Sequence, residues 1–254
     1  MAAATWPDLV KGAGNQGYTD PKGDHDDGPA VTEVTFDHIM HKAWHFIDQP
    51  IWVGEGPQGK LPEAPKVNAV GVVNILIKQL HGREAVPAQA YDLGWLLHLV
   101  GDLHQPLHAV TGYSKLLPKG DAGGNDVVIK GDVKGARELH GFWDDILGKE
   151  ASPTNLTADI NTANTIIALV QNNAPSGNQL DPATWAFESK DMAQKDVYNL
   201  TLEPLTRGDK PQKKVEATID STYGATAADD ARARIRTAGH RLALLLQSIL
   251  QALN

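Results

Sequence analysis

The sequence predicts a mainly α-helical protein that folds as a single domain over residues 1–254. Apolar residues recur at helical spacing in several segments, and proline and glycine mark the boundaries between these segments. Hydrophobic residues make up 41% of the chain and charged residues 21%, as is typical of globular proteins. No internal repeat or clear linker divides the chain, and its length is ample for a buried core.

The first half of the chain predicts one exposed loop followed by three helices. Residues 11–33 are rich in Gly, Asp and Pro, which indicates the loop. A helix over residues 36–46 would place His38, His41 and His45 on one face. The next two helices are expected over residues 67–81 and 87–105, the second opened by Pro87 and stopped by Pro106.

The second half predicts a loop region followed by further helices. Residues 115–135 are expected to form a loop with a small hairpin around residues 127–129. Helices are expected over residues 138–147, 161–172, 185–200 and 227–253. The buried stripe of the last helix is predicted to be Ile235, Leu242, Leu245, Leu246, Ile249 and Leu253.

Composition and charge exclude several classes of protein. A formal net charge of −8 argues against a basic surface that follows a phosphate backbone, so any contact with nucleic acid would depend on metal ions and stacking. No stretch of apolar residues is long enough to cross a membrane. The chain has no cysteine, which excludes disulfides and thiolate ligands. Residues 1–8 lack the features of a signal peptide.

Two His/Asp pairs with the same spacing indicate a metal site. His98 and Asp102, like His140 and Asp144, stand four residues apart and therefore share one helical face. His108 follows beyond Pro106, where the chain can turn back over the first pair. Imidazole and carboxylate ligands suit Zn²⁺. A single pair could be a buried hydrogen bond between two core side chains, but five such groups on two apolar segments favour a multinuclear metal site.

The other histidines carry weaker signals. His104 points away from His98 and Asp102 on a helix, so it is expected to support the site rather than to bind metal. His41 and His45 could form a third pair, or His41 could be a partly exposed residue of an amphipathic helix.

Several motifs occur in an order that resembles the zinc-dependent S1/P1 nuclease family, which is related to the bacterial zinc phospholipases C. The motifs are Ala4-Thr-Trp-Pro-Asp8, His45-Phe-Ile-Asp48, His98-Leu-Val-Gly-Asp-Leu-His-Gln-Pro-Leu-His108, Gly123-Gly-Asn125 and Leu139-His-Gly-Phe-Trp-Asp144. The resemblance covers nearly the whole chain. It implies the helical fold of the P1 nucleases and phospholipases C.

The resemblance also implies roles for individual residues. Asp48 matches the family's active-site aspartate, which orients or deprotonates the attacking water, although it could also be a helix-end carboxylate. Asn125 matches a position near the second metal that contacts substrate, or it is a turn residue. The implied ligands are Asp8, His45, His98 and Asp102 for a first zinc ion, and His108, His140 and Asp144 for a second.

The sequence departs from the family at its beginning. Family members bind a third zinc ion through an N-terminal Trp and a nearby His, but no Trp or His precedes Trp6 here. Of that third site the sequence retains Asp102 alone, so the chain is expected to lack the N-terminal segment of the family fold. If a signal peptide lies upstream, the protein is expected to be secreted or periplasmic.

The expected function is that of a zinc-dependent endonuclease acting on single-stranded DNA and RNA, with 5′-phosphate products and 3′-nucleotidase activity. Asp144 favours the nucleases, because the phospholipase branch carries Glu at this position. Two alternatives remain open: a phospholipase C-like phosphodiesterase, and an inactive helical protein in which zinc serves folding. The expected partners are single-stranded nucleic acid and 3′-nucleotides, and no oligomer is predicted.

Overall fold

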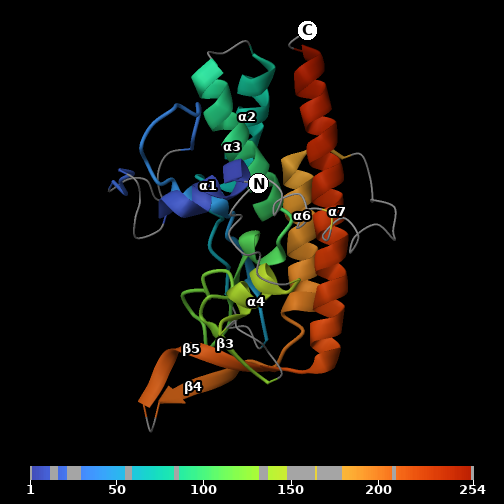
Figure 1. Ribbon diagram of the computed structural model, residues 1–254. Coiled ribbons are helices and arrows are strands. Elements are labelled where there is room, and N and C mark those ends of the chain that lie inside the picture. The colour runs from blue at the N-terminus through green and yellow to red at the C-terminus, as the bar shows by residue number, and fades with distance from the viewer. Residues whose placement is uncertain are drawn as a thin grey trace.

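The computed structural model describes residues 2–11, 17–21, 30–54, 59–82, 86–131, 137–147, 164, 179–207 and 210–252. The described part is helical with two small sheets (Figure 1). The helices are α1 (Ala2–Lys11), α2 (Ala69–His81), α3 (Val86–Asp102), α4 (Leu139–Asp145), α6 (Pro182–Met192) and α7 (Ser221–Ala252). Shorter helical turns are η1 (Lys42–His45), η2 (Pro106–His108) and η3 (Ala193–Val197), the last a π-helix that continues α6.

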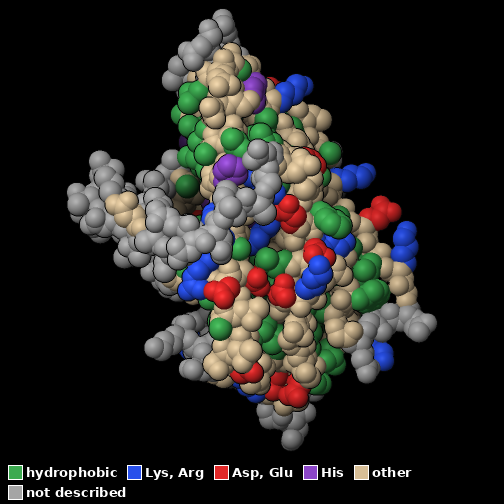
Figure 2. Space-filling view, turned by 90° about the vertical axis from the view of Figure 1, so that its right-hand side faces the viewer, with side chains coloured by type: hydrophobic (Ala, Val, Ile, Leu, Met, Phe, Trp, Pro, Cys, Tyr) green, Lys and Arg blue, Asp and Glu red, His purple; other side chains and the backbone are tan. Residues whose placement is uncertain are grey.

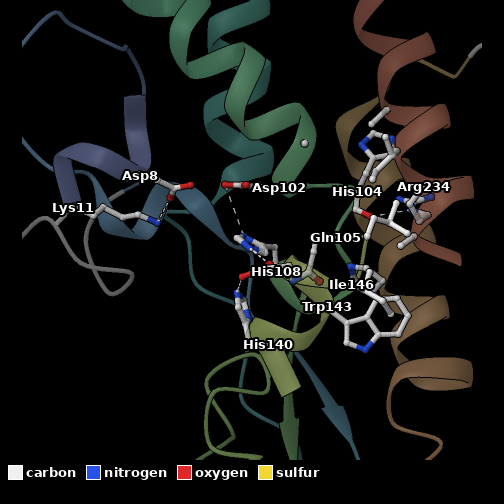
Figure 3. Close-up of a pocket in the computed structure, with 17 residues that line it drawn as sticks. Asp8, Lys11, Asp102, His104, Gln105, His108, His140, Trp143, Ile146 and Arg234 are labelled. Atoms are coloured by element: carbon white, nitrogen blue, oxygen red, sulfur yellow. Dashed lines mark hydrogen bonds and ion pairs between the residues drawn. The ribbon is translucent and has the colours of Figure 1, made fainter. Parts of the chain in front are cut away.

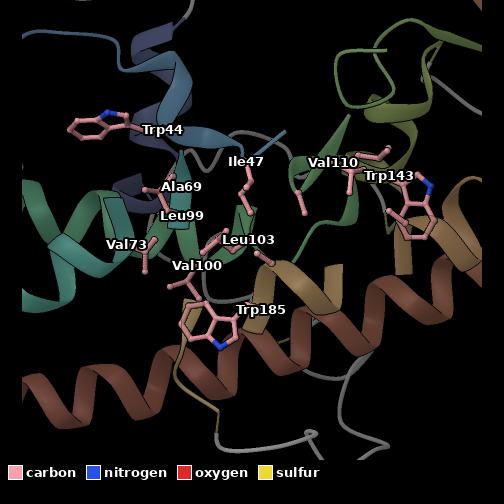
Figure 4. Packing of buried hydrophobic residues seen from close by; sticks show 14 of the residues in the cluster. Trp44, Ile47, Ala69, Val73, Leu99, Val100, Leu103, Val110, Trp143 and Trp185 are labelled. Atoms are coloured by element: carbon pink, nitrogen blue, oxygen red, sulfur yellow. The ribbon is translucent and has the colours of Figure 1, made fainter. Parts of the chain in front are cut away.

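The helices pack around α3, which carries the central residues of the core. α2 lies beside α3, and α7 runs along one side of the molecule against both of them and α6 (Figure 1). Trp95 and Leu99 of α3 and Trp185 of α6 are completely buried. Figure 4 shows side chains of α2, α3 and the β1–β2 region that belong to the same buried cluster as Trp185. Burial of this apolar surface is the main force that holds the helices together.

Two small sheets complete the fold. β1 (Gln49–Trp52) and β2 (Val110–Tyr113) pair in parallel. The segments that precede them are also bound together, because the Ile47 backbone N–H donates to His108 O at 2.8 Å. In the second sheet, β5 (Lys210–Ile219) lies between β3 (Val127–Gly131) and β4 (Glu203–Arg207). The hairpin formed by β4 and β5 projects from the end of the molecule opposite the C-terminus (Figure 1).

Most of the predicted helices are present, with small shifts at their ends. The segments predicted at 67–81, 87–105, 138–147, 185–200 and 227–253 correspond to α2, α3, α4, α6 with η3, and α7. Local signals explain two of the starts: Asn68 accepts from the Gly71 backbone N–H at 3.0 Å, and Asp181 accepts from the N–H groups of Ala183 and Thr184 at 3.2 Å. The helix predicted over 161–172 lies outside the described residues, apart from residue 164.

The helix predicted over residues 36–46 is wrong. This segment has no regular secondary structure apart from an isolated bridge between Ile39 and Thr19 and the short turn η1. The Asp37 carboxylate accepts a hydrogen bond from the Ile39 backbone at 2.9 Å, which is the local bond by which Asp competes with helix formation. His41 then adopts a left-handed conformation with φ 46°, which ends any helical path.

The pairing of the strands and the buried face of α7 also differ from the predictions. The strand expected around residues 127–129 is present as β3, but the small hairpin predicted there is reduced to one antiparallel bridge between Val128 and Glu138. The ladder of β3 is instead parallel with β5, far along the chain. The strands β4 and β5 were not predicted from the sequence. Ile235 was predicted to be buried but is 42% exposed, and the Ala231, Arg234 and Arg241 side chains take the buried face of α7 instead. Among the described residues, no helix combines the length and apolar character needed to cross a membrane.

Candidate metal centre

Two groups of described side chains are placed so that each could hold a metal ion. Within each group the possible ligand atoms lie within 4.8 Å of one another. The groups are Asp8, His45 and His98, and His108, His140 and Asp144. The remaining expected ligand, Asp102, contacts both groups: its Oδ2 lies 3.0 Å from His98 Nε2 and 3.8 Å from His108 Nδ1.

The first group depends on aromatic packing against α3. The ring of Trp6 in α1 contacts those of Tyr91 and Trp95 with centroids 5.5 and 5.9 Å away, which carries Asp8 to the end of α3. His45 closes the turn η1, and its ring lies 5.3 Å from that of Trp95. Its Nδ1 is 2.8 Å from His98 Nε2. Asp8 Oδ1 lies 3.7 Å from that Nδ1.

The second group joins the turn after α3 to α4. Asp144 Oδ1 lies 3.8 Å from His108 Nε2, and its Oδ2 lies 3.5 Å from His140 Nε2. The rings of His108 and His140 have centroids 4.8 Å apart. The pair His140 and Asp144 shares a face of α4, as the four-residue spacing predicts.

Backbone carbonyls fix the orientation of three of the four imidazoles. The Nδ1–H groups of His98, His108 and His140 donate to the carbonyls of Ala4, His45 and Gly123 at 2.7, 2.8 and 2.7 Å. A carbonyl can only accept, so in a neutral ring Nε2 keeps its lone pair. This arrangement is characteristic of histidines that ligate metals. His45 instead offers Nδ1, and its buried Nε2 has no hydrogen-bond partner among the described residues.

The spacing of the donor atoms fits a small divalent cation. Ligands bound to zinc at 2.0–2.1 Å in a tetrahedron stand about 3.3 Å from one another. The donor separations described above are of this size in both groups, and imidazole with carboxylate is a common zinc donor set.

The electrostatics of the site favour positive charge between its carboxylates. Burial alone would lower the pKa of His108, but Asp102 and Asp144 raise it to about 9. Burial would raise the pKa of Asp102, yet the imidazoles of His108, His45 and His98 hold it below its usual range. The field that attracts a proton to His108 would equally attract a divalent cation.

Asp48 belongs to neither group of ligands, and it is not among the residues that line the pocket over the centre. Its backbone adopts φ 52°, an uncommon left-handed conformation, immediately before β1. Its Oδ1 accepts a hydrogen bond of 2.5 Å from the hydroxyl of Thr111 in β2. A residue held in a rare conformation with a fixed carboxylate is consistent with a functional position.

Asn125 belongs to the loop that supports His140. Its side-chain amide donates to Ala122 O at 2.8 Å, as expected for a turn residue. The glycines before it have a clearer structural reason: Gly123 adopts φ +61°, and a Cβ there would lie 2.6 Å from Leu107 O. Only glycine lets this loop approach closely enough to present its carbonyl to His140.

Behind the centre, a buried charged cluster holds the end of α3 against α6 and α7. Arg234 Nε donates to His104 O at 3.0 Å, and Arg241 Nη1 lies 2.9 Å from His104 Nε2. The carboxylate of Glu188 pairs with both arginines. Both ring nitrogens of His104 are engaged, Nδ1 with Val100 O at 2.7 Å and Nε2 with Arg241, and His104 belongs to neither ligand group. The two arginines and Glu188 were not predicted from the sequence to take part.

A pocket of about 510 Å³ opens over the centre (Figure 3). One side carries Asp8, Asp102, His108, His140 and Asp144. Ile146 and Trp143 of the α4 region and Ile235 of α7 form an apolar wall. Lys11 pairs with Asp8 at 2.7 Å and places a positive charge at the pocket. It was not predicted from the sequence, although it lies one helical turn from Asp8. On the face drawn in Figure 2, Lys and Arg are scattered among Asp and Glu rather than gathered in a band.

Comparison with known proteins identifies the family of the chain. A model of the S1/P1 nuclease family matches residues 1–251. The chain is also similar to Nuclease S1 of Aspergillus oryzae, with 34% identity over 79 residues, which are 31% of this chain and 23% of that relative. The matched part therefore spans about a quarter of the relative's length. Because the family model covers almost the whole chain, the resemblance read from the motifs is confirmed, and the protein belongs to the S1/P1 nuclease family.

Proposed function

We propose that this protein is a zinc-dependent nuclease that cleaves single-stranded DNA and RNA, leaves 5′-phosphates and removes the phosphate of 3′-nucleotides. The observation that carries the proposal is the convergence of two His/Asp groups on one pocket in a member of a nuclease family. A single strand suits such a pocket, because a base that is not held in a duplex is free to stack on a protein surface.

In this proposal each group of side chains holds one zinc ion. Bound zinc neutralises phosphate oxygens and lowers the pKa of water toward about 7. The protein's own contribution is to fix the ligands before metal and substrate arrive, through the three carbonyl-bound imidazoles. The ligands are Asp8, His45, His98 and Asp102 for the first ion, and His108, His140 and Asp144 for the second.

Two further side chains would act on the substrate and the attacking water. We assign Asp48 to orient this water and accept its proton, since Thr111 holds its carboxylate in place. Lys11 stands at the pocket beside Asp8 and would neutralise charge on the phosphate once a metal ion occupies Asp8. For Asn125, the hydrogen bond to Ala122 O supports a role in shaping the loop near His140.

The test is hydrolysis by the purified chain loaded with zinc. We expect cleavage of a single-stranded oligonucleotide to 5′-phosphate ends and release of phosphate from 3′-AMP, both stopped by a chelator and restored by zinc. Asp48→Asn is expected to abolish hydrolysis while zinc content stays at the wild-type value. Phosphatidylcholine is the competing substrate, and its preferential cleavage would favour a phospholipase. Bound zinc without hydrolysis of any substrate would mean that the metal serves folding.

A further inference from the structure

Gln105 makes hydrogen bonds with two parts of the proposed second zinc site. It follows the end of α3 and precedes the turn η2, which ends at His108. Its side chain makes two hydrogen bonds with different partners. Oε1 accepts from the Leu107 backbone N–H, and Nε2 donates to Asp144 Oδ1 at 2.9 Å. One side chain therefore contacts both the turn that ends at His108 and the carboxylate of Asp144.

The first of these bonds sets the direction of η2. Gln105 is the cap of this turn, and its backbone carbonyl accepts from the His108 N–H at 3.1 Å. A cap that satisfies a free N–H at the start of a helical turn fixes how the chain enters it. His108 leaves the turn with its ring already bound to His45 O. The cap thus helps to decide where Nε2 of His108 stands.

The second bond adds a restraint on the side chain of Asp144. Asp144 projects from the short helix α4, and its side chain is 43% exposed. Oδ1 faces His108 and takes the bond from Gln105, whereas Oδ2 faces His140. Because the amide of Gln105 is neutral, it restrains this carboxylate without adding charge that competes with the metal.

Gln105 is itself held firmly by the rest of the fold. Its backbone N–H donates to Asp102 O at 3.0 Å. The preceding residues are bound to α6 and α7, since Ser189 Oγ donates to Leu103 O at 2.7 Å and Arg234 donates to His104 O. A side chain that starts from such a fixed backbone can position others.

We propose that Gln105 is a positioning residue for the second zinc site: it sets the carboxylate of Asp144 and the turn that delivers His108, so that both ligands are arranged before the metal binds. The inference rests on the zinc assignment in the proposed function. Loss of an outer hydrogen-bond partner of metal ligands typically weakens metal affinity about 10- to 100-fold. Gln105 also lines the pocket, so a direct contact with substrate is the competing explanation.

The test replaces Gln105 with Met, which keeps the length of the side chain and removes both hydrogen bonds. We expect Gln105→Met to bind one zinc ion as tightly as the wild type and the other about 10- to 100-fold more weakly, in a competition titration with a chromogenic chelator. The matched control is Gln79→Met. Gln79 is also a part-buried glutamine, with hydrogen bonds to the Val34 backbone and to the Asp92 carboxylate, neither of which belongs to a ligand group. Gln79→Met is expected to lower the melting temperature without changing the affinity for zinc.

The outcomes separate this inference from the proposed function. Zinc affinities of Gln105→Met within twofold of the wild type would overturn the positioning role, whatever the activity. A rise in KM with unchanged zinc affinity would also overturn it and assign Gln105 to substrate. If the wild type binds two zinc ions but hydrolyses nothing, the nuclease proposal fails, while the affinity measurement still decides the role of Gln105. If the wild type binds no zinc, the zinc assignment and this inference fail together.

Discussion

The carboxylate of Glu188 gives a quantitative test of how the end of α3 is held. It accepts three hydrogen bonds, from Arg234 Nη1 at 2.8 Å and from Arg241 Nη1 and Nη2 at 2.7 Å. Glu188→Gln would leave two guanidinium groups, 8% and 1% exposed, without their counter-charge. Removing one partner of a buried pair costs about 3–5 kcal/mol. Because the Glu188 side chain is 34% exposed, we expect the lower end, about 3 kcal/mol.

For a chain of this size, that loss corresponds to a fall of about 6–12 °C in the melting temperature. The assay is thermal unfolding of the zinc-loaded protein at pH 7, with Asp191→Asn as the matched control. Asp191 lies on the same helix and pairs with Lys195 at 2.6 Å, but these side chains are 49% and 66% exposed. An exposed pair is worth less than about 1 kcal/mol, so this variant should melt close to the wild type. An equal fall in melting temperature in both variants would refute the reasoning, because the two ion pairs differ in how deeply their charges are buried.

The pH dependence of the same variant follows from the pKa of Glu188. Burial would raise this pKa, but Arg241 and Arg234 lower it from 4.5 to about 2. A carboxyl group with a lowered pKa in the folded state stabilises the fold above pH 4.5, and this stabilisation is lost as the pH falls toward 2. The difference in melting temperature between Glu188→Gln and the wild type should therefore narrow as the pH falls from 4.5 toward 2. A difference that stays constant would contradict the assignment of the charge to Glu188.

Three further substitutions test other parts of the site and fold. Asp102→Ala should lose both zinc and stability, since Asp102 contacts both groups of ligands; full zinc content with an unchanged melting temperature would disprove the assignment. Lys11→Met should raise KM for an oligonucleotide and leave zinc affinity intact, and weaker zinc binding would argue against a role toward phosphate. Asp230→Asn should raise the melting temperature at pH 7 but not at pH 4. Burial, Asp196 and Asp229 raise the pKa of Asp230 to about 6, so the folded state loses stability as its carboxyl ionises with rising pH. An equal change in melting temperature at both pH values would contradict the assignment of this effect to ionisation of Asp230.

The parts of the site that could be predicted from the sequence are those that follow from helical geometry. The spacing of His98 and Asp102 places both on one face of α3, and His140 and Asp144 repeat this on α4. Pro106 predicts the end of α3, and with it the turn that brings His108 back toward Asp102. Each of these statements depends on residues close together in the chain.

Other features depend on contacts between distant segments, which spacing does not reveal. The pairing of β3 with β5 and the carbonyls that orient the imidazoles belong to this class. Two patterns in the sequence nevertheless indicated features that were not predicted. Gly208-Asp209 between β4 and β5 is a known two-residue hairpin pattern. Arg234 and Arg241 fall on the same helical stripe as Ala231 and Leu245, so charged residues in an apolar stripe indicated a buried ion pair.

The short segment from Asp102 to His108 links the two proposed zinc sites, and this predicts how they respond to metal removal. Asp102 contacts the first group of ligands, and His108 belongs to the second. The Ile47 backbone N–H donates to His108 O, which ties the turn to the segment between His45 and β1. Each zinc ion present at about a thousand times its dissociation constant adds about 4 kcal/mol, or about 8–16 °C in melting temperature. Because hydrogen bonds to α6 and α7 already hold this segment without metal, the first ion has little left to order, and the two ions should bind independently. Titration of the metal-free protein with zinc should then show two separate steps, each with its own share of the stabilisation. Cooperative uptake, in which both ions enter together, would show instead that the segment is ordered only by metal and that the ligands are not arranged beforehand.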